Sequence, residues 1–335
     1  MKLSHAAFAI LLASAAAGAE ELRRFQFEEP HMGTKFRIVL YAADEPTAKK
    51  ASEAAFKRVG QLNRIMSDYD AQSELMQLCR KFATTVGDPV PISEDLFFVL
   101  AKGQEVAKRS GGAFDMSIGP FVQLWRQARR TQKLPTAEAI ADAKRRVGYE
   151  KIELNEKHRT VRLKTPGMQL DLGGIAKGYA ADQMLAVLKR HGITRALVAA
   201  GGDVAVADPP PQETGWKVDV APLTKDKPQY SLRLANAAVS TSGDSQQFTI
   251  IDSVRYSHIV DPRTGLGMTG RRSSSVIAKN GITSDSMTKA VMLMDPAKAL
   301  ELIEATPETA TLIITLNDDG KEIVQMSKRM ASYLR

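Results

Sequence analysis

Apolar side chains recur at the spacing of an α-helix in several stretches of the chain. The clearest stretch covers residues 46–65, where Ala55, Val59 and Leu62 fall on one face. Another begins after Ser93, which we expect to be its N-cap, and stops before Gly111. The same pattern predicts helices over residues 46–65, 93–110, 119–131, 136–147, 175–190, 282–294 and 296–305.

Other stretches alternate apolar and polar residues, as half-buried strands do. Residues 25–41 alternate on both sides of Met32-Gly33-Thr34 and predict a bent strand or two strands. Further strands or hairpins are expected at residues 152–154, 160–163, 196–199, 216–260, 311–314 and 322–325, with a short apolar strand ending at Asp171. Helices and strands do not alternate strictly, which favours an α+β fold over a doubly wound sheet. We expect one large mixed domain over residues 20–335, with two intimately joined lobes as the alternative.

The N-terminus has the three parts of a secretory signal peptide. Lys2 supplies the positive charge, an apolar run covers residues 6–17, and Ala17-Gly18-Ala19 forms a small-x-small cleavage site. The run is shorter than the roughly 20 apolar residues of a membrane span. We therefore expect residues 1–19 to be removed and the mature chain to be soluble and periplasmic, without a membrane span. The alternative is a disordered or helical tail.

Composition excludes some classes of protein. With Cys79 as its only cysteine, the chain cannot form an internal disulfide or a thiolate metal cluster. The formal charge of +8 is modest, and its main basic clusters, residues 126–130 and 144–146, lie on helical patterns that suggest solvated faces. No aromatic residues are interleaved with them, which argues against a nucleic-acid partner.

The segment from Asp171 to Lys177 carries the first chemical signal. An acid is followed by Gly173 and Gly174, then by a lysine at the start of a predicted helix. Glycines in such a turn let the backbone approach anionic oxygens, and the lysine can neutralise phosphate. This pattern indicates a phosphate or nucleotide site, although a tight strand-to-helix connection would look the same.

Several segments in a fixed order resemble one family. They include Gly111-Gly112-Ala113-Phe114-Asp115, the run from Asp171 to Ala180, residues 199–203, 240–244 and 284–290, and the run from Ser257 to Gly265. At these spacings the chain, from about Phe25 to its C-terminal hairpin, resembles the ApbE family of FAD:protein FMN transferases. The resemblance implies an ApbE (T-fold-like) domain of the α+β class.

The resemblance also implies an activity. Family members bind FAD and a divalent cation, usually magnesium, cleave the FAD pyrophosphate and transfer FMN to a threonine hydroxyl of an acceptor flavoprotein, releasing AMP. The acceptors are subunits of membrane electron-transport complexes. A pyrophosphate needs cationic stabilisation more than covalent catalysis, and a threonine hydroxyl benefits from a positioned base.

Family roles carry over to individual positions of this chain. The expected FAD contacts are Met32, Tyr69, Ala113, Phe114, Asp115, Asp171, Lys177 and Ile259. Lys177 is expected near phosphate, His258 as base or proton shuttle, and Gly174 (through its carbonyl) and Asp285 as metal ligands. From the residues alone, Met32 and Phe114 could be core, Tyr69 a half-buried surface ring, Asp171 a helix cap and His258 a hydrogen-bonded strand histidine.

The chain departs from the family pattern at two positions. The family usually has threonine four residues after the metal-binding aspartate, where this chain has Lys289. Thr288 is a weak candidate ligand, because one residue rotates a helical side chain by about 100°. Either the cation has fewer protein ligands, or Lys289 takes part of its place, or Lys289 points to solvent. Cys79 stands where relatives commonly have asparagine. An FAD pyrophosphatase and a non-catalytic FAD-binding protein therefore remain alternatives to the transferase.

Overall fold

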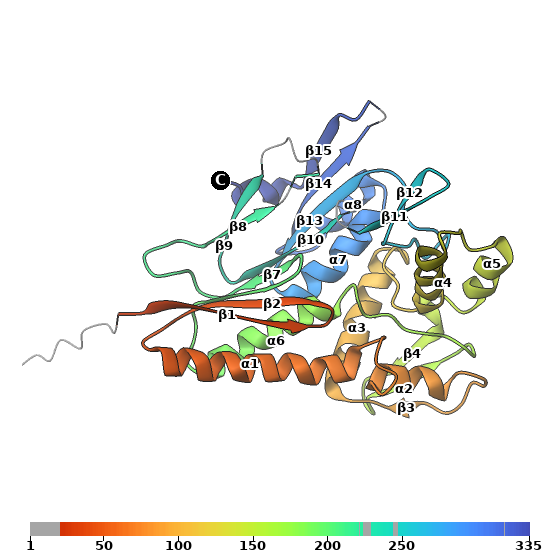
Figure 1. Cartoon of the computed structure of the whole chain (residues 1–335), viewed down its shortest axis with the longest axis horizontal. Helices are drawn as coiled ribbons and strands as arrows, with labels where there is room; N and C mark the ends of the chain where they lie inside the picture. Colours follow the sequence, from red (N-terminus) through yellow and green to blue (C-terminus); the bar gives the residue numbers. More distant parts are fainter. Residues whose placement is uncertain (1–20, 221, 224–228, 244–246, 318) are drawn as a thin grey trace, which may run out of the picture.

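The computed structural model describes residues 21–220, 222–223, 229–243, 247–317 and 319–335. The predicted signal peptide and Asp244 lie outside this part. Within it, eight strands form one antiparallel sheet in the order β1-β2-β6-β7-β10-β13-β14-β15 (Figure 1). Their bounds are β1 Arg23–His31, β2 Thr34–Ala42, β6 Ala196–Ala200, β7 Asp203–Val206, β10 Ala237–Gly243, β13 Arg272–Ala278, β14 Ala310–Leu316 and β15 Glu322–Met326.

Helices and smaller sheets surround this central sheet. The helices are α1 Glu45–Met66, α2 Glu74–Lys81, α3 Glu94–Arg109, α4 Gly119–Thr131, α5 Ala137–Arg145, α6 Ala176–Arg190, α7 Gly281–Leu293 and α8 Pro296–Glu304, with 3-10 turns η1 Tyr149–Lys151 and η2 Lys328–Ser332. The smaller sheets pair β3 Val90–Pro91 and β4 Ile152–Asn155 with β5 Thr160–Leu163, β8 Trp216–Val220 with β9 Tyr230–Leu234, and β11 Phe248–Ile251 with β12 Val254–Ser257.

Both faces of the central sheet are covered, and β2 shows how the sequence divides between them. Ile38 and Leu40 belong to the core shared with α1, α6 and α7, whereas Val39 packs into a second core with the β8–β9 hairpin. Successive strand residues point to opposite faces. The helices α1, α6 and α7 therefore pack on one face of the central sheet, and the β8–β9 hairpin packs on the other face.

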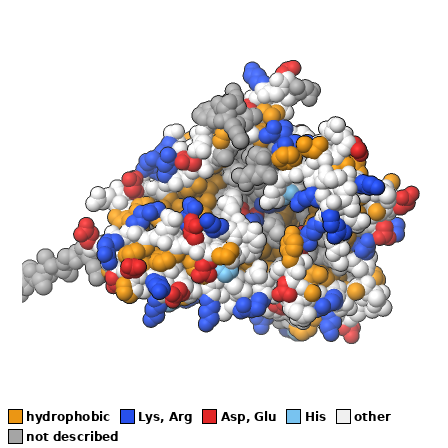
Figure 2. Space-filling view, in the orientation of Figure 1, with side chains coloured by type: hydrophobic (Ala, Val, Ile, Leu, Met, Phe, Trp, Pro, Cys, Tyr) orange, Lys and Arg blue, Asp and Glu red, His pale blue; other side chains and the backbone are white. Residues whose placement is uncertain are grey.

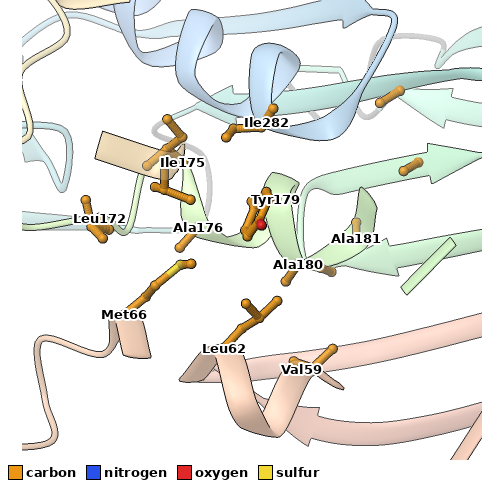
Figure 3. Packing of buried hydrophobic residues seen from close by; sticks show 14 of the residues in the cluster. Val59, Leu62, Met66, Leu172, Ile175, Ala176, Tyr179, Ala180, Ala181 and Ile282 are labelled. Atoms are coloured by element: carbon orange, nitrogen blue, oxygen red, sulfur yellow. The ribbon is translucent and has the colours of Figure 1, made fainter. Parts of the chain in front are cut away.

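Helix α6, which carries Lys177, is fixed by apolar contacts with α1. Leu62 and Met66 of α1 face Ala176 and Ala180 of α6, all four buried (Figure 3). Such small alanine side chains allow two helices to approach closely. The N-terminal turn of α6 is therefore held rigidly.

Helices α6 and α7 cross at a pair of glycines. A Cβ placed on Gly178 would lie only 2.1 Å from the carbonyl oxygen of Gly281 and 2.7 Å from the Cβ of Asp285. Gly281 and Ile282 donate their backbone N–H groups to Asp182 of α6 at 2.6 and 2.9 Å. Glycine is required at Gly178 because any side chain there would push the helices apart.

The structure confirms the α+β class and most predicted elements, with several differences. The strand expected to end at Asp171 is wrong, since one isolated bridge, from Ile118 to Gln169, marks that region. The backbone N–H of Leu170 donates to Cys79 Sγ, and the backbone N–H of Asp171 donates to the carbonyl oxygen of Met116. These residues therefore form no continuous β-ladder with a neighbouring strand. Helix α2 and strands β3, β7 and β13 were not predicted.

The molecular surface mixes the two signs of charge. Figure 2 shows Lys and Arg side chains spread over the visible face among Asp and Glu. In the part of the chain that the structure describes, the helices are too short or too polar for any of them to traverse a bilayer.

Candidate active site

The turn before α6 contains Asp171 and Gly173, which belong to the segment predicted to bind phosphate. Asp171 Oδ1 accepts the backbone N–H of Gly173 at 2.7 Å, while buried Leu172 and Ile175 anchor the turn. The N-cap of α6 is Ile175, so the interpretation of Asp171 as a helix cap is wrong. The N–H of Gly173 is likewise used within the turn and does not point toward a ligand.

Lys177 leaves the first turn of α6 toward two acids. Its Nζ lies 3.0 Å from Asp203 Oδ2 and 3.6 Å from Asp285 Oδ2, and it donates to the carbonyl of Gly173 at 3.1 Å. Although burial opposes it, the charges of Asp285 and Asp203 raise the pKa of Lys177 above its usual value. Lys177 is therefore a permanent cation at the glycine turn.

Asp285 is fully buried on α7 and joins two lysines. Its Oδ1 accepts from Lys289 Nζ at 2.6 Å, and its Oδ2 accepts the backbone N–H of Gly178 at 3.0 Å. Burial alone would raise the pKa of this carboxyl, but Lys177 and Lys289 hold it below the usual value. We call Lys177, Asp203, Asp285 and Lys289 the lysine–aspartate cluster. The interpretation in which Lys289 points to solvent is wrong.

Hydroxyl groups fix α7 against β10 behind this cluster. Ser240 Oγ and Ser284 Oγ lie 2.9 Å apart, and Ser242 Oγ donates to Thr288 Oγ1 at 3.1 Å. Thr288 itself donates to the carbonyl of Asp285 at 2.7 Å. These buried hydrogen bonds hold the helix face that presents Asp285 in one position.

A second group of residues lies beside the glycine turn and is more open to solvent. Arg126 of α4 pairs with Asp68, lies 4.0 Å from Asp171 Oδ2, and has its guanidinium 4.0 Å from the centre of the Tyr69 ring. Burial raises the pKa of Asp171, and the charge of Asp68 adds to this effect. We call Asp68, Tyr69, Arg126 and Asp171 the arginine–tyrosine cluster. Tyr69 is 81% exposed, so its ring is free to stack on a flat ligand.

His258 follows β12 and is held in one tautomer. Its Nδ1 lies 3.1 Å from the carbonyl oxygen of Gln247, which only accepts, so Nδ1 carries the proton and Nε2 keeps its lone pair. Burial lowers the pKa of His258 to about 4, and the charges of Lys289, Arg129 and Lys177 act in the same direction. The imidazole is therefore neutral at physiological pH and chemically able to accept a proton.

The remaining predicted FAD contacts are the residues from Ala113 to Asp115, Ile259 and Met32. Ala113 and Ile259 share one small apolar cluster, and Phe114 Cε2 would lie 3.4 Å from a Cβ placed on Gly174. Burial raises the pKa of Asp115, whose Oδ1 accepts the N–H and the hydroxyl of Ser117 at 2.7 Å. Asp115 therefore already has a structural role.

Met32 lies in the two-residue turn between β1 and β2. Met32 and Gly33 both have positive φ, 47° and 72°, as a type I′ hairpin turn requires. The following residue, Thr34, contacts the Gly201 turn just before Asp203: a Cβ on Gly201 would lie 3.3 Å from Thr34 Oγ1. Met32 thus lies on the hairpin that borders the lysine–aspartate cluster.

The sequence interpretation missed Asp203, Arg126 and the contact of Lys289 with Asp285. Asp203 directly follows Gly201 and Gly202, and this position after two glycines was the available sequence signal. Arg126 was grouped with a solvated basic face. That interpretation holds for Arg129 and Arg130, which are exposed, but not for Arg126. Among the described residues, no three His, Cys, Asp or Glu side chains come close enough to hold a metal ion.

The fold and these clusters define an α+β protein with an ionised site, containing two lysines and two aspartates, at the N-terminal turn of α6. The model of the ApbE family matches residues 32–314, and the chain belongs to that family. A Klebsiella pneumoniae relative called FAD:protein FMN transferase is 28% identical over 90% of this chain and 87% of its own length. A Haemophilus influenzae relative of the same name is 29% identical over 95% and 94%.

Solved structures agree with this assignment. The flavin transferase ApbE from Vibrio cholerae superposes with a TM-score of 0.83 at 26% identity, covering 94% of this chain and all of that one. The apo form of the Pseudomonas stutzeri flavinyl transferase ApbE gives a TM-score of 0.81 at 26% identity, over 93% of this chain and 96% of that one. The similarity therefore extends over the whole described domain.

Proposed function

We propose that this chain is an exported FAD:protein FMN transferase. The observation that carries the proposal is the lysine–aspartate cluster at the α6 turn, with neutral His258 in its electrostatic field. Two ammonium groups suit a diphosphate, and a histidine with a free Nε2 suits a hydroxyl nucleophile. The named activity of the relatives supports the same assignment.

The proposed reaction transfers one phosphoryl group. The threonine Oγ of the acceptor attacks the FMN phosphorus, and a new Oγ–P bond forms. The bond from this phosphorus to the bridging oxygen breaks, and AMP leaves with that oxygen. His258 Nε2 takes the hydroxyl proton and returns it to solvent. Lys177 and Lys289 stabilise the negative charge on the diphosphate oxygens, where electrostatic stabilisation contributes most in phosphoryl transfer.

The flavin and adenosine ends of FAD would use the neighbouring side chains. We propose Met32, Tyr69, Phe114 and Ile259 as apolar or stacking contacts, because aromatic rings and other apolar side chains suit flat ring systems. Ala113, Asp115 and Asp171 complete the proposed set. Asp115 would act indirectly, through the turn that it holds with Ser117.

The expected magnesium site does not fit the residues present. Gly174, Asp285 and Thr288 are the positions that the resemblance assigns to the metal. Lys289 forms an ion pair with Asp285 at 2.6 Å, and an ammonium cannot ligate a cation. No step of the proposed reaction is therefore assigned to a metal.

The location and partner follow from the N-terminus and the chemistry. We propose that residues 1–19 are a signal peptide and that the mature domain acts in the periplasm. Its partner would be a flavoprotein with a target threonine, a subunit of a membrane electron-transport complex. A protein acceptor is consistent with the activity named for the relatives.

Product analysis tests this function. Purified mature chain is added with FAD to membranes from a strain lacking its gene, and proteins are then separated under denaturing conditions. Flavin fluorescence on a protein band, with AMP released, is the expected result. Free FMN and AMP without a labelled band would indicate a pyrophosphatase, and intact FAD would indicate a binding protein. Either result would contradict the proposal.

The role of His258 is tested in the same assay. His258→Ala should slow transfer about 10²–10⁴-fold, the usual contribution of a general base, and change FAD affinity by only a few-fold. His158→Ala, at an exposed position in the β4–β5 connection, is the matched control and should behave as wild type. Normal turnover by bound enzyme with weak FAD binding would contradict the base assignment.

A further inference from the structure

The side chain of Lys289 lies between the two main positions that the resemblance gives to a metal. At one end, its Nζ is 2.6 Å from Asp285 Oδ1. Along its length it passes over Gly174, where an added Cβ would lie 3.1 Å from Lys289 Cγ and 3.6 Å from Lys289 Cε. The lysine side chain therefore lies beside Gly174 and ends on Asp285, the two positions that the resemblance assigns to the metal.

The oxygen atoms around Lys289 are already engaged. Asp285 Oδ1 binds Lys289, and Oδ2 accepts the N–H of Gly178 at 3.0 Å. Thr288 Oγ1 donates to the carbonyl of Asp285 and accepts from Ser242 Oγ at 3.1 Å and Lys289 Nζ at 3.3 Å. One donor and two lone pairs are all that a hydroxyl has. Thr288, the weak candidate ligand, thus has no lone pair left for a cation.

The charges of the lysine–aspartate cluster balance without a metal. Asp203 and Asp285, which are 4% and 0% exposed, carry two negative charges, and Lys177 and Lys289 carry two positive charges. Threonine in place of Lys289 would leave one uncompensated negative charge in a buried position. A divalent ion added to the cluster as it stands would lie against an ammonium group and be repelled.

The Lys289 side chain is also partly exposed, and its charge acts on His258. Its side chain is 20% exposed, so the ammonium is accessible at the surface of the cluster rather than sealed in the core. After burial, the charge of Lys289 is the largest that lowers the pKa of His258. A flexible point charge at this position can follow a phosphate oxygen without strict geometry.

We propose that the Lys289 ammonium is a built-in cation that replaces the divalent metal ion at the FAD diphosphate. FAD binding and FMN transfer by this chain are then independent of divalent metal. This inference rests on the proposed function for the transfer step, but its binding step is tested without an acceptor.

The first experiment measures metal and FAD binding by calorimetry and thermal shift. Wild type should bind FAD equally well with EDTA or with magnesium. Lys289→Thr should bind magnesium, in the presence of FAD, at least about tenfold more tightly than wild type, because a like charge is removed at short range. Lys289→Met, which keeps length but supplies neither charge nor oxygen, should weaken FAD binding without gaining magnesium affinity. Lys279→Thr, a change at a lysine that is 62% exposed, is the control and should match wild type.

The results separate this inference from the proposed function. Metal-independent FAD binding without any transfer would leave the inference intact and overturn the function. FMN transfer that occurs only with magnesium would support the proposed function and overturn the inference about Lys289. The inference is wrong if wild type binds magnesium as tightly as Lys289→Thr, or if EDTA releases FAD from wild type.

Discussion

The lysine–aspartate cluster and the arginine–tyrosine cluster flank the glycine turn of this protein. They differ in how deeply their side chains are buried and in the basic side chain they contain, lysine in the first and arginine in the second. In the lysine–aspartate cluster both carboxylates are buried and each side chain contacts at least one partner of opposite charge. In the arginine–tyrosine cluster Arg126 is 34% exposed and Tyr69 is 81% exposed. The first cluster is rooted in the crossing of α6 and α7, and the second lies where α4 meets a loop.

This difference indicates a division of labour. Buried charges must be matched, so the lysine–aspartate cluster is preorganised and couples the site to the stability of the fold. The exposed ring and guanidinium contribute little to folding but can adapt to a ligand. We therefore expect changes in the first cluster to affect both stability and activity, and changes in the second to affect mainly ligand affinity.

The largest effect on stability is expected from Asp285→Asn. Removing the shared carboxylate leaves Lys289 without its ion-pair partner, which should cost about 3–5 kcal/mol in free energy of unfolding. Chemical denaturation measures this loss. Asp142→Asn is the control, because Asp142 forms exposed pairs with Arg145 and Arg146, and it should cost less than about 1 kcal/mol. The double variant Asp285→Asn/Lys289→Met should lose less than the sum of the single changes, and simple additivity would show that the two residues are not coupled.

The next largest effect is expected from Gly178→Ala. A Cβ there would lie 2.1 Å from the Gly281 carbonyl oxygen, so α6 and α7 must separate, at a cost of about 3 kcal/mol. Gly60→Ala is a matched change in α1, with no atom within 4 Å of the added carbon, and should stabilise by about 0.5–1 kcal/mol. Both are measured by thermal or chemical unfolding. Equal effects at the two glycines would contradict the close crossing.

The pH dependence of stability should reveal the neutral state of His258. Its pKa is about 4 in the folded chain and about 6.5 in an unfolded chain. Between these values only the unfolded chain takes up the proton, so stability falls as the pH drops from 6.5 to 4. Unfolding free energies of wild type and His258→Gln across this range should show a smaller decrease in the variant. A wild-type slope in His258→Gln would be inconsistent with the lowered pKa.

The smallest effect is expected from Tyr69→Ala. Stacking on an aromatic ring contributes about 1–3 kcal/mol for a base, so FAD affinity should fall at least about fivefold. Folding stability should change little, because the ring is 81% exposed. Fluorescence titration with FAD and a parallel melt test both parts. A large loss of stability with unchanged affinity would reverse the roles that we assign to the two clusters.

The sequence predicted the frame of the site better than its contacts. The amphipathic patterns placed α1, α3, α4 and α6 to within one or two residues of their observed ends, because their buried faces repeat at helical spacing. The region of Asp171 was mispredicted as a strand, since Leu170 and Leu172 are buried in a loop and not in a ladder. Buried positions carry apolar residues in loops as well as in strands, so an apolar pattern alone does not identify a strand.

The partners of charged residues could not be predicted in the same way. Asp203, Asp285 and Lys177 lie far apart in the sequence, and they meet because β7, α7 and α6 converge. Arg126 looked like part of a solvated face, and its guanidinium turns toward Asp68 and Asp171 only because α4 packs beside them. Cys79 is buried with its pKa raised to about 11, and its sulfur accepts the N–H of Leu170. Its thiol therefore has a structural role.

The central claim is that the lysines of the buried cluster bind the diphosphate, and comparing FAD with FMN in one titration tests it most directly. Flavin fluorescence is followed as each ligand is added to wild type and to Lys177→Met, with EDTA present. We predict tighter binding of FAD than of FMN by wild type, and a smaller difference between the two ligands in the variant. Equal or tighter binding of FMN by wild type would contradict a site organised around the diphosphate.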